Sequence, residues 1–99
     1  MQADSLKMDY LQRFYALCRQ HYIRLVFVIS PKYTKVSAEH YDVLKNFAKM
    51  NDIPFLDYHT SGLYLDRPDY FKDYVHLWDE GAEAYSSRFA QDLKMIVAD

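Results

Sequence analysis

The chain has little cysteine, glycine or proline and almost no charge imbalance, and each shortage narrows the classes of protein to which it can belong. A single cysteine, Cys18, excludes an internal disulfide and a cysteine-based zinc site; we expect it to be a small buried residue on a helix. Two glycines and three prolines are too few for an all-β fold with many tight turns. The net charge of −2 offers no basic surface, so nucleic acid is not expected as a ligand.

Long hydrophobic runs are also lacking. No stretch approaches the roughly 20 apolar residues that span a bilayer, so we expect no membrane span. Residues 1–4 do not resemble the basic start of a signal peptide, and the sequence leaves the cellular compartment open. Ninety-nine residues allow a single α/β domain, or the C-terminal fragment of a larger one.

Aromatic residues, in contrast, are abundant. Ten tyrosines and six phenylalanines stand in a chain that is 51% hydrophobic and 26% charged. Part of this aromatic surface is expected to contact a partner, either a second copy of the chain or a missing N-terminal half of the protein.

The first half of the chain reads as a helix, a strand, a helix and a strand. Apolar residues at three- and four-residue steps predict a helix over 5–21, capped by Asp4 or Ser5. A nearly continuous apolar run over 23–29 predicts a strand buried on both faces, as in a parallel sheet. Ser37 is predicted as the N-cap of a helix that ends near residue 50, and residues 53–57 as a second strand.

The second half reads as a long loop followed by a helix. Residues 58–74 show no sustained period, and loops of this length in compact domains are often functional. A helix is predicted from Asp79, with acidic residues in its first turn. Its inward stripe consists of Ala82, Tyr85, Phe89, Leu93 and Ile96. Strands alternating with helices imply parallel strands joined by crossover helices, and the order resembles the C-terminal half of a three-layer α/β/α sandwich.

Asp73 and His76 are the residues with the clearest catalytic potential. They lie on the loop that connects the end of the second strand to the last helix, and in open α/β sheets ligands bind beyond the carboxyl ends of the strands. His76 could take a proton from a serine while Asp73 holds its other ring nitrogen and stabilises the imidazolium. The structural alternative is that Asp73 caps a turn and His76 packs against the sheet edge.

Several other histidines, aspartates and serines have side chains that could take part in chemistry. Asp57 and His59, together with the Asp73–His76 pair, are residue types that bind zinc, but their spacing does not define a metal site. His59 otherwise reads as a polar loop residue at the rim of the site, and His21 and His40 as solvent-facing residues. Ser30 lacks the surroundings of a nucleophile elbow, Ser61 is an ordinary loop serine that is as able as Ser30 to approach the site, and no serine is assigned as a nucleophile.

Residues 73–86 carry a resemblance to a known family. The run Asp73-Tyr-Val-His76-Leu-Trp78-Asp-Glu-Gly81-Ala82, with Tyr85-Ser86 beyond it, resembles the last conserved block of the SGNH (GDSL-type) hydrolases. That block commonly reads Asp-x-x-His-Leu-Asn, two further residues, Gly-Ala and an aromatic-Ser pair. The weaker upstream similarity begins near residue 20 and includes a strand that ends in Ser30-Pro31.

The resemblance implies a flavodoxin-like SGNH-hydrolase fold and a serine esterase, lipase-like enzyme or acyl transferase. The substrate would be an ester-bearing small molecule or an acylated glycan, and the chemistry would use no metal or cofactor. Asp73 and His76 would be catalytic. The family's Ser, Gly and Asn blocks have no counterpart in these residues, and Trp78 replaces the usual asparagine. The isolated chain is therefore expected to be inactive.

A second hypothesis of a different class is a non-catalytic α/β binding module. In this interpretation the aromatic loop 58–74 contacts a ligand or another chain, because tyrosine offers a large contact area with a polar tip. Alanine at His76 would then leave function intact, while changes at Tyr64 or Tyr70 would weaken binding. Self-association through an exposed strand edge is a related expectation.

Overall fold

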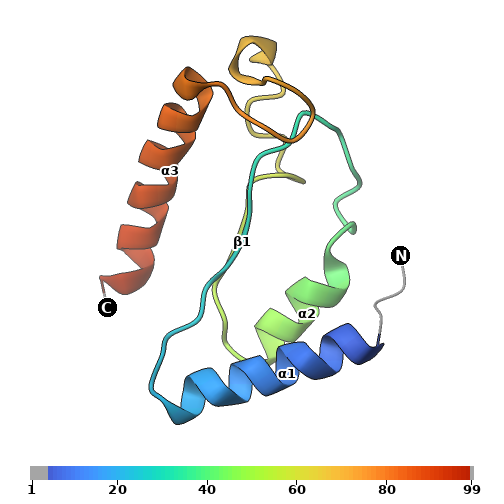
Figure 1. Ribbon diagram of the computed structural model, residues 1–99, viewed down its shortest axis with the longest axis vertical. Coiled ribbons are helices and arrows are strands. Elements are labelled where there is room, and N and C mark those ends of the chain that lie inside the picture. Colours follow the sequence, from blue (N-terminus) through green and yellow to red (C-terminus); the bar gives the residue numbers. More distant parts are fainter. Residues whose placement is uncertain (1–4, 99) are drawn as a thin grey trace. The chain divides into compact units, whose positions relative to one another are not determined.

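The computed structural model describes residues 5–98 and contains both helices and strands (Figure 1). The elements in chain order are α1 (Ser5–Gln20), β1 (Phe27–Ile29), α2 (Asp42–Met50), β2 (Phe55–Asp57), the 3₁₀ helix η1 (Pro68–Tyr70) and α3 (Asp79–Val97). The order confirms the predicted succession of helices and strands. Asp4, one of the two proposed caps of the first helix, lies outside the described residues, and Ser5 is already helical.

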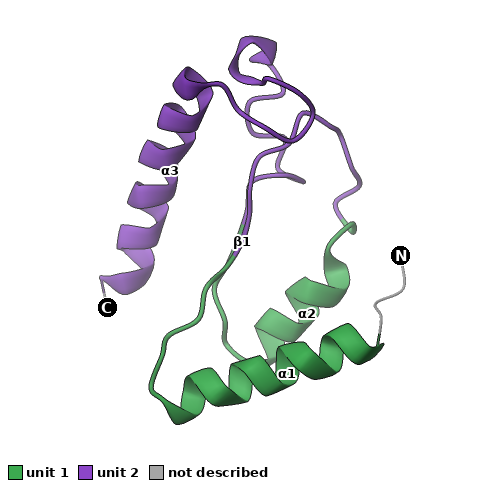
Figure 2. Cartoon of the chain, viewed as in Figure 1, with its two compact units in different colours: residues 1–27, 39–56 green, residues 28–38, 57–99 purple. Residues whose placement is uncertain are grey.

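The two strands form a parallel two-stranded sheet, as the crossover pattern predicted. The N–H of Phe27 donates to the carbonyl of Pro54 at 2.9 Å, and the N–H of Tyr58 donates to the carbonyl of Ile29 at 2.9 Å. Both strands pass through the two compact units of the chain (Figure 2). Unit 1 comprises residues 1–27 and 39–56, and unit 2 comprises residues 28–38 and 57–99.

Unit 1 is built on a small core between its two helices. Phe47, Ala48 and Ile53 are buried, and the Phe27 ring stacks on Phe47 with centroids 6.2 Å apart. The partly buried residues packed against this core are Met8, Leu11, Tyr15, Leu25, Phe27 and Phe55. Cys18 is buried on α1, which confirms the prediction for this residue.

Both helices of unit 1 end in the same way, and neither uses glycine. Tyr22 (φ 57°) and Asp52 (φ 54°) adopt the left-handed conformation just after α1 and α2. The N–H groups of Ile23 and Ile53 then donate to the carbonyls of Cys18 and Ala48, each at 2.8 Å. Each is the 6→1 hydrogen bond of a Schellman motif, which satisfies carbonyls that a helix end leaves unpaired.

These helix ends explain why the strands are shorter than predicted. Strands were expected over 23–29 and 53–57, but the structure has Phe27–Ile29 and Phe55–Asp57. The N–H groups of Ile23 and Ile53 are used to close the preceding helices, and Pro54 has no N–H to donate. The expectation of complete burial is also wrong, because all six strand residues are only partly buried.

The predicted start of the second helix is also wrong. Ser37 is not its N-cap: α2 begins at Asp42 after a turn, and Tyr41 occupies the cap position without a side-chain cap bond. The N–H of Asp42 donates to the carbonyl of Glu39 at 3.1 Å, so backbone turn bonds supply the partners that a capping serine would have offered.

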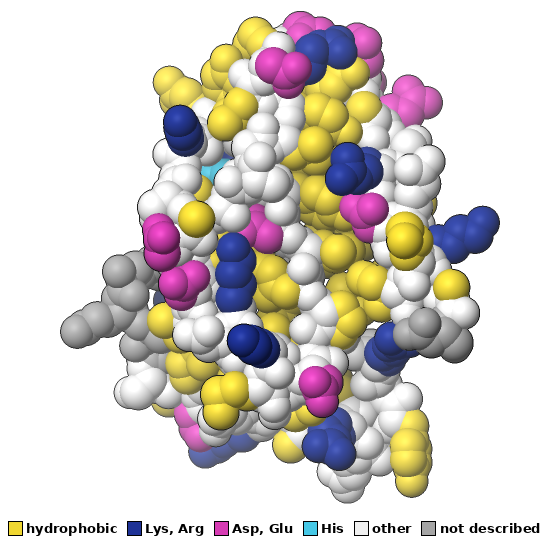
Figure 3. All heavy atoms as spheres, turned by 180° about the vertical axis from the view of Figure 1, so that it is seen from behind, with side chains coloured by type: hydrophobic (Ala, Val, Ile, Leu, Met, Phe, Trp, Pro, Cys, Tyr) yellow, Lys and Arg dark blue, Asp and Glu magenta, His cyan; other side chains and the backbone are white. Residues whose placement is uncertain are grey.

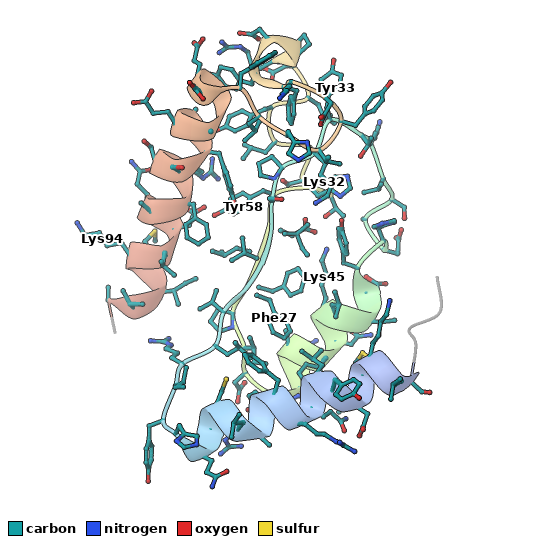
Figure 4. All side chains as sticks on the ribbon, in the orientation of Figure 1. Phe27, Lys32, Tyr33, Lys45, Tyr58 and Lys94 are labelled. Carbon is teal, nitrogen blue, oxygen red and sulfur yellow. The ribbon has the colours of Figure 1, made fainter. Side chains whose placement is uncertain are left out.

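Unit 2 contains the long loop and α3, which begins at Asp79 as predicted. The side chain of Tyr58 is directed towards α3 (Figure 4), where its ring centroid lies 5.2 Å from that of Tyr85 and 6.4 Å from that of Phe89. Its hydroxyl donates to Oδ2 of Asp92 at 2.6 Å. The predicted inward residues of α3 are all partly buried. This aromatic cluster anchors the start of the loop to the last helix.

Two further properties of the chain concern the apolarity of its helices and the distribution of its charges. Among residues 5–98, no helix has both the length and the apolarity needed to cross a membrane. On the face shown in Figure 3, basic and acidic side chains are interspersed.

Candidate functional site

The candidate site is a short hairpin that residues 70–78 form between η1 and α3. Phe71 and Leu77 form an antiparallel bridge. On either side of it, the N–H of Lys72 donates to the carbonyl of His76 at 2.9 Å, and the N–H of Trp78 donates to that of Tyr70 at 2.8 Å. The hairpin thus places Asp73 and His76 together in its tight end, which the sequence had described only as an irregular loop.

A buried contact with the segment after β1 holds the hairpin in place. Phe71 is buried, and its ring centroid lies 5.1 Å from that of Tyr33. The N–H of Tyr33 donates to the carbonyl of Tyr74 at 2.8 Å. Tyr33 lies beside Lys32 in the segment that follows β1 (Figure 4). The hairpin is therefore fixed both by packing and by a backbone hydrogen bond.

Asp73 both closes the turn and holds the histidine ring. Its Oδ1 accepts from the N–H groups of Val75 and His76, each at 2.9 Å. Both carboxylate oxygens also lie 2.9 Å from Nδ1 of His76. The Val75 N–H and then the His76 ring hold the pKa of Asp73 below its usual range. The carboxylate is therefore ionised at neutral pH.

The ring of His76 is oriented by this pairing. An ionised carboxylate can only accept a hydrogen bond, so Nδ1 carries the ring proton and the lone pair of a neutral imidazole lies on Nε2. The His76 side chain is 69% exposed, and no described residue provides a hydrogen-bond partner for Nε2. The turn-capping alternative for Asp73 is thus correct together with the pairing, while His76 does not pack against the sheet edge.

Trp78 and Lys72 lie on the same face of the hairpin as His76. Side chains alternate between the two faces of a strand pair; Phe71 and Leu77 take one face, which leaves the other to their neighbours. The Lys72 ammonium lies 5.8 Å from the centroid of the Trp78 ring, which places both on this second face. Trp78 is 53% exposed.

The histidine that sequence analysis placed at the rim, His59, is instead buried, with 4% of its surface exposed. Its Nε2 lies 2.9 Å from Oγ1 and 3.0 Å from the carbonyl oxygen of Thr34. Because a carbonyl only accepts, Nε2 carries the proton and donates to Thr34, so His59 is not poised to deprotonate the threonine hydroxyl. We conclude that His59 ties the loop to the segment after β1.

The Asp57 carboxylate likewise accepts hydrogen bonds from neighbouring residues. Its Oδ1 accepts from the N–H groups of His59 and Thr60 at 2.9 and 3.0 Å, and its Oδ2 accepts from the Thr60 hydroxyl. Within residues 5–98, no three His, Cys, Asp or Glu side chains are grouped so that they could hold a metal ion. Asp57 and His59 therefore do not join Asp73 and His76 in a metal site.

The remaining residues considered for the site lie on the surface. Ser30, Ser61, His21 and His40 are all exposed, so the two histidines are solvent-facing as predicted. Tyr64 and Tyr70 are half-buried, with their rings 5.1 Å apart, and Arg67 lies 4.0 Å from the Tyr70 ring centroid. Tyr64, Arg67 and Tyr70 thus pack against one another within the loop. Comparison with protein-family models, curated proteins and solved structures finds no match for this chain.

Proposed function

We propose that this chain is the C-terminal part of an SGNH-type serine ester hydrolase or acyl transferase, in which Asp73 and His76 supply two of the three members of a catalytic triad. The observation that carries the proposal is the pairing of both Asp73 carboxylate oxygens with Nδ1 of His76 at 2.9 Å, in a histidine side chain that is 69% exposed. This is the arrangement that a general base requires.

In the proposed reaction, Nε2 of His76 takes the proton from a serine hydroxyl as that oxygen attacks the ester carbonyl. The resulting imidazolium is stabilised by the adjacent Asp73 carboxylate, whose lowered pKa keeps it ionised. His76 then gives the proton to the leaving alkoxide. Water or an acceptor alcohol then attacks the acyl-enzyme while His76 takes its proton. His76 returns this proton to the serine oxygen as the acyl group is released.

The serine and the oxyanion-hole donors would come from residues outside this chain. The parallel pair β1–β2 is compatible with one part of a larger parallel sheet, and in the proposed three-layer sandwich further strands extend it. The substrate would be an ester-bearing small molecule or an acylated glycan. The proposed chemistry uses no metal or cofactor.

The exposed residues beside His76 also favour a second function, that of a binding module. Tyr74, Val75 and Trp78, which lie within two residues of His76 in the sequence, are 68%, 52% and 53% exposed. In such a module these side chains would contact the ligand, and proton transfer would play no part. The two functions differ in what they require of His76.

A fluorophosphonate probe, read by mass spectrometry, tests the catalytic proposal in the protein expressed from its full reading frame. We expect one serine outside this chain to be labelled. Labelling should slow about 10²-fold or more in His76→Ala and also in Asp73→Asn, but not in His21→Ala, which removes an exposed histidine from the other unit.

Three outcomes would contradict the proposal. A reading frame without an upstream strand and Asp-Ser block would remove the source of the nucleophile. Labelling that is unaffected by His76→Ala would show that His76 is not the base and would favour the binding module. Labelling of a serine within residues 1–99 that depends on His76 would place a complete site in this chain.

A further inference from the structure

Helix α1 has a second apolar face, which is separate from the one that packs on the core of unit 1. The core face carries Met8, Leu11, Tyr15 and Cys18. The exposed apolar residues of the helix are Leu6 (58% exposed), Tyr10 (60%), Phe14 (53%) and Leu17 (53%). At 3.6 residues per turn these four fall within an arc of about 80°, centred roughly 130° around the helix axis from the core face.

This second face is unusual for a surface helix. Single exposed apolar residues need no explanation, but four large ones in a continuous stripe mark an interaction site. Most hydrophilic residues of α1 lie on the remaining arc, where Arg13 pairs with Asp9 at 2.9 Å. Lys7 is the exception and lies between the second apolar face and the core face. We call Leu6, Tyr10, Phe14 and Leu17 the α1 stripe.

We infer that the α1 stripe binds the same stripe of a second copy of this chain, with the two helices antiparallel. In a two-fold arrangement centred between residues 11 and 12, Leu6 lies opposite Leu17, and Tyr10 lies within one residue's rise, about 1.5 Å, of the level of Phe14. Each pair matches one residue of the stripe with another. The spacing of the stripe is therefore self-complementary, which a symmetric interface requires.

The charges at the edge of the stripe support the same arrangement. Asp9 and Arg13 both lie along one edge, and in an antiparallel pair the same edges of the two helices meet. Asp9 of one copy then lies within one residue's rise, about 1.5 Å, of the level of Arg13 of the other, and the reciprocal pair forms on the other side of the two-fold axis. Opposite charges at such flanking positions set partner choice and orientation.

Analytical ultracentrifugation of the protein over a range of concentrations tests this inference. We expect a concentration-dependent dimer that Tyr10→Glu with Phe14→Glu converts to a monomer. Met95→Glu, which places the same charge at a 77%-exposed apolar residue of α3, should leave the dimer intact. Circular dichroism checks that each variant retains its helices.

The charge pair tests the orientation. Asp9→Arg alone should weaken dimerisation several-fold, because like charges then face each other, and adding Arg13→Asp should restore it. A protein that stays monomeric at all concentrations would overturn the inference, as would a dimer that Tyr10→Glu with Phe14→Glu leaves unchanged. A monomer that binds anionic lipid vesicles through the stripe would assign it to a membrane surface instead. None of these results depends on the proposed catalytic role of His76.

Discussion

Gly81 of α3 lies directly against Tyr70 of η1. A Cβ atom on Gly81 would stand 2.6 Å from the carbonyl oxygen and 2.7 Å from the Cβ of Tyr70. That same carbonyl accepts the hydrogen bond from Trp78 that closes the hairpin. The absence of a side chain at residue 81 is therefore what allows the hairpin with Asp73 and His76 to join the last helix in this geometry.

Replacement of Gly81 by alanine should destabilise the protein, although alanine is the better helix former. Steric overlap with the Tyr70 backbone should cost about 1–3 kcal/mol, more than the gain in helix propensity of up to about 1 kcal/mol. Chemical denaturation measures the change. An unchanged or increased free energy of unfolding would show that the backbone yields easily here.

Loss of the His76 side chain should remove only part of the lowering of the Asp73 pKa. The main cause of its lowered pKa is the N–H of Val75, and the His76 ring comes second. In His76→Ala the pKa of Asp73 should rise but stay below its ordinary value of about 3.9. Carboxyl chemical shifts followed by NMR measure both values. A return to the ordinary value would assign the whole effect to the histidine.

The same shift has a consequence for stability at low pH. Because folding lowers the pKa of Asp73, its contribution is fully present above the unfolded pKa and is lost as pH falls through the folded value. In the proposed reaction, the Asp73 carboxylate should therefore still be ionised at pH 5 and should be protonated only in more acidic solution.

Removal of the Tyr58 hydroxyl should raise the pKa of Asp92 and destabilise unit 2. The Tyr58 hydroxyl is the first cause of the lowered pKa of Asp92, and Arg88 the second. Above the unfolded pKa of Asp92, Tyr58→Phe should lower the free energy of unfolding, and the difference should shrink as pH falls through the folded value. Urea denaturation of the wild type and of Tyr58→Phe, at pH 7 and at pH 3, measures this difference at each pH. An equal difference in the free energy of unfolding at both pH values would point to packing of the ring instead.

Glycine at residue 22 should stabilise the end of α1. Tyr22 is 97% exposed and sits in the left-handed conformation, which costs roughly 1–2 kcal/mol for residues with a Cβ. Glycine is more flexible in the unfolded chain, which offsets part of this gain. Tyr22→Gly should therefore raise the free energy of unfolding by about 0.5–1 kcal/mol. Tyr22→Ala is the matched control, because it removes the ring but keeps the strained conformation. Equal effects of the two changes would contradict this explanation.

By itself the sequence determined the elements whose signals are local. Apolar periodicity located α1 and α3 nearly to the residue, and the continuous apolar runs located both strands. The spacing of Asp73 and His76 on the loop before a helix was enough to select them as a pair. These features depend on neighbours within a few residues, so a single chain read in order contains them.

Only the tertiary structure decided what depends on contacts between distant residues. The strands are short because the helix ends before them use the N–H groups of Ile23 and Ile53. His59 is buried, and its ring bonds to Thr34, 25 residues earlier. The hairpin that orients His76 is held by Tyr33 and by the close approach of Gly81 to Tyr70. Hydrogen-bond partners and steric contacts of this kind follow from the path of the folded chain, which no local pattern specifies.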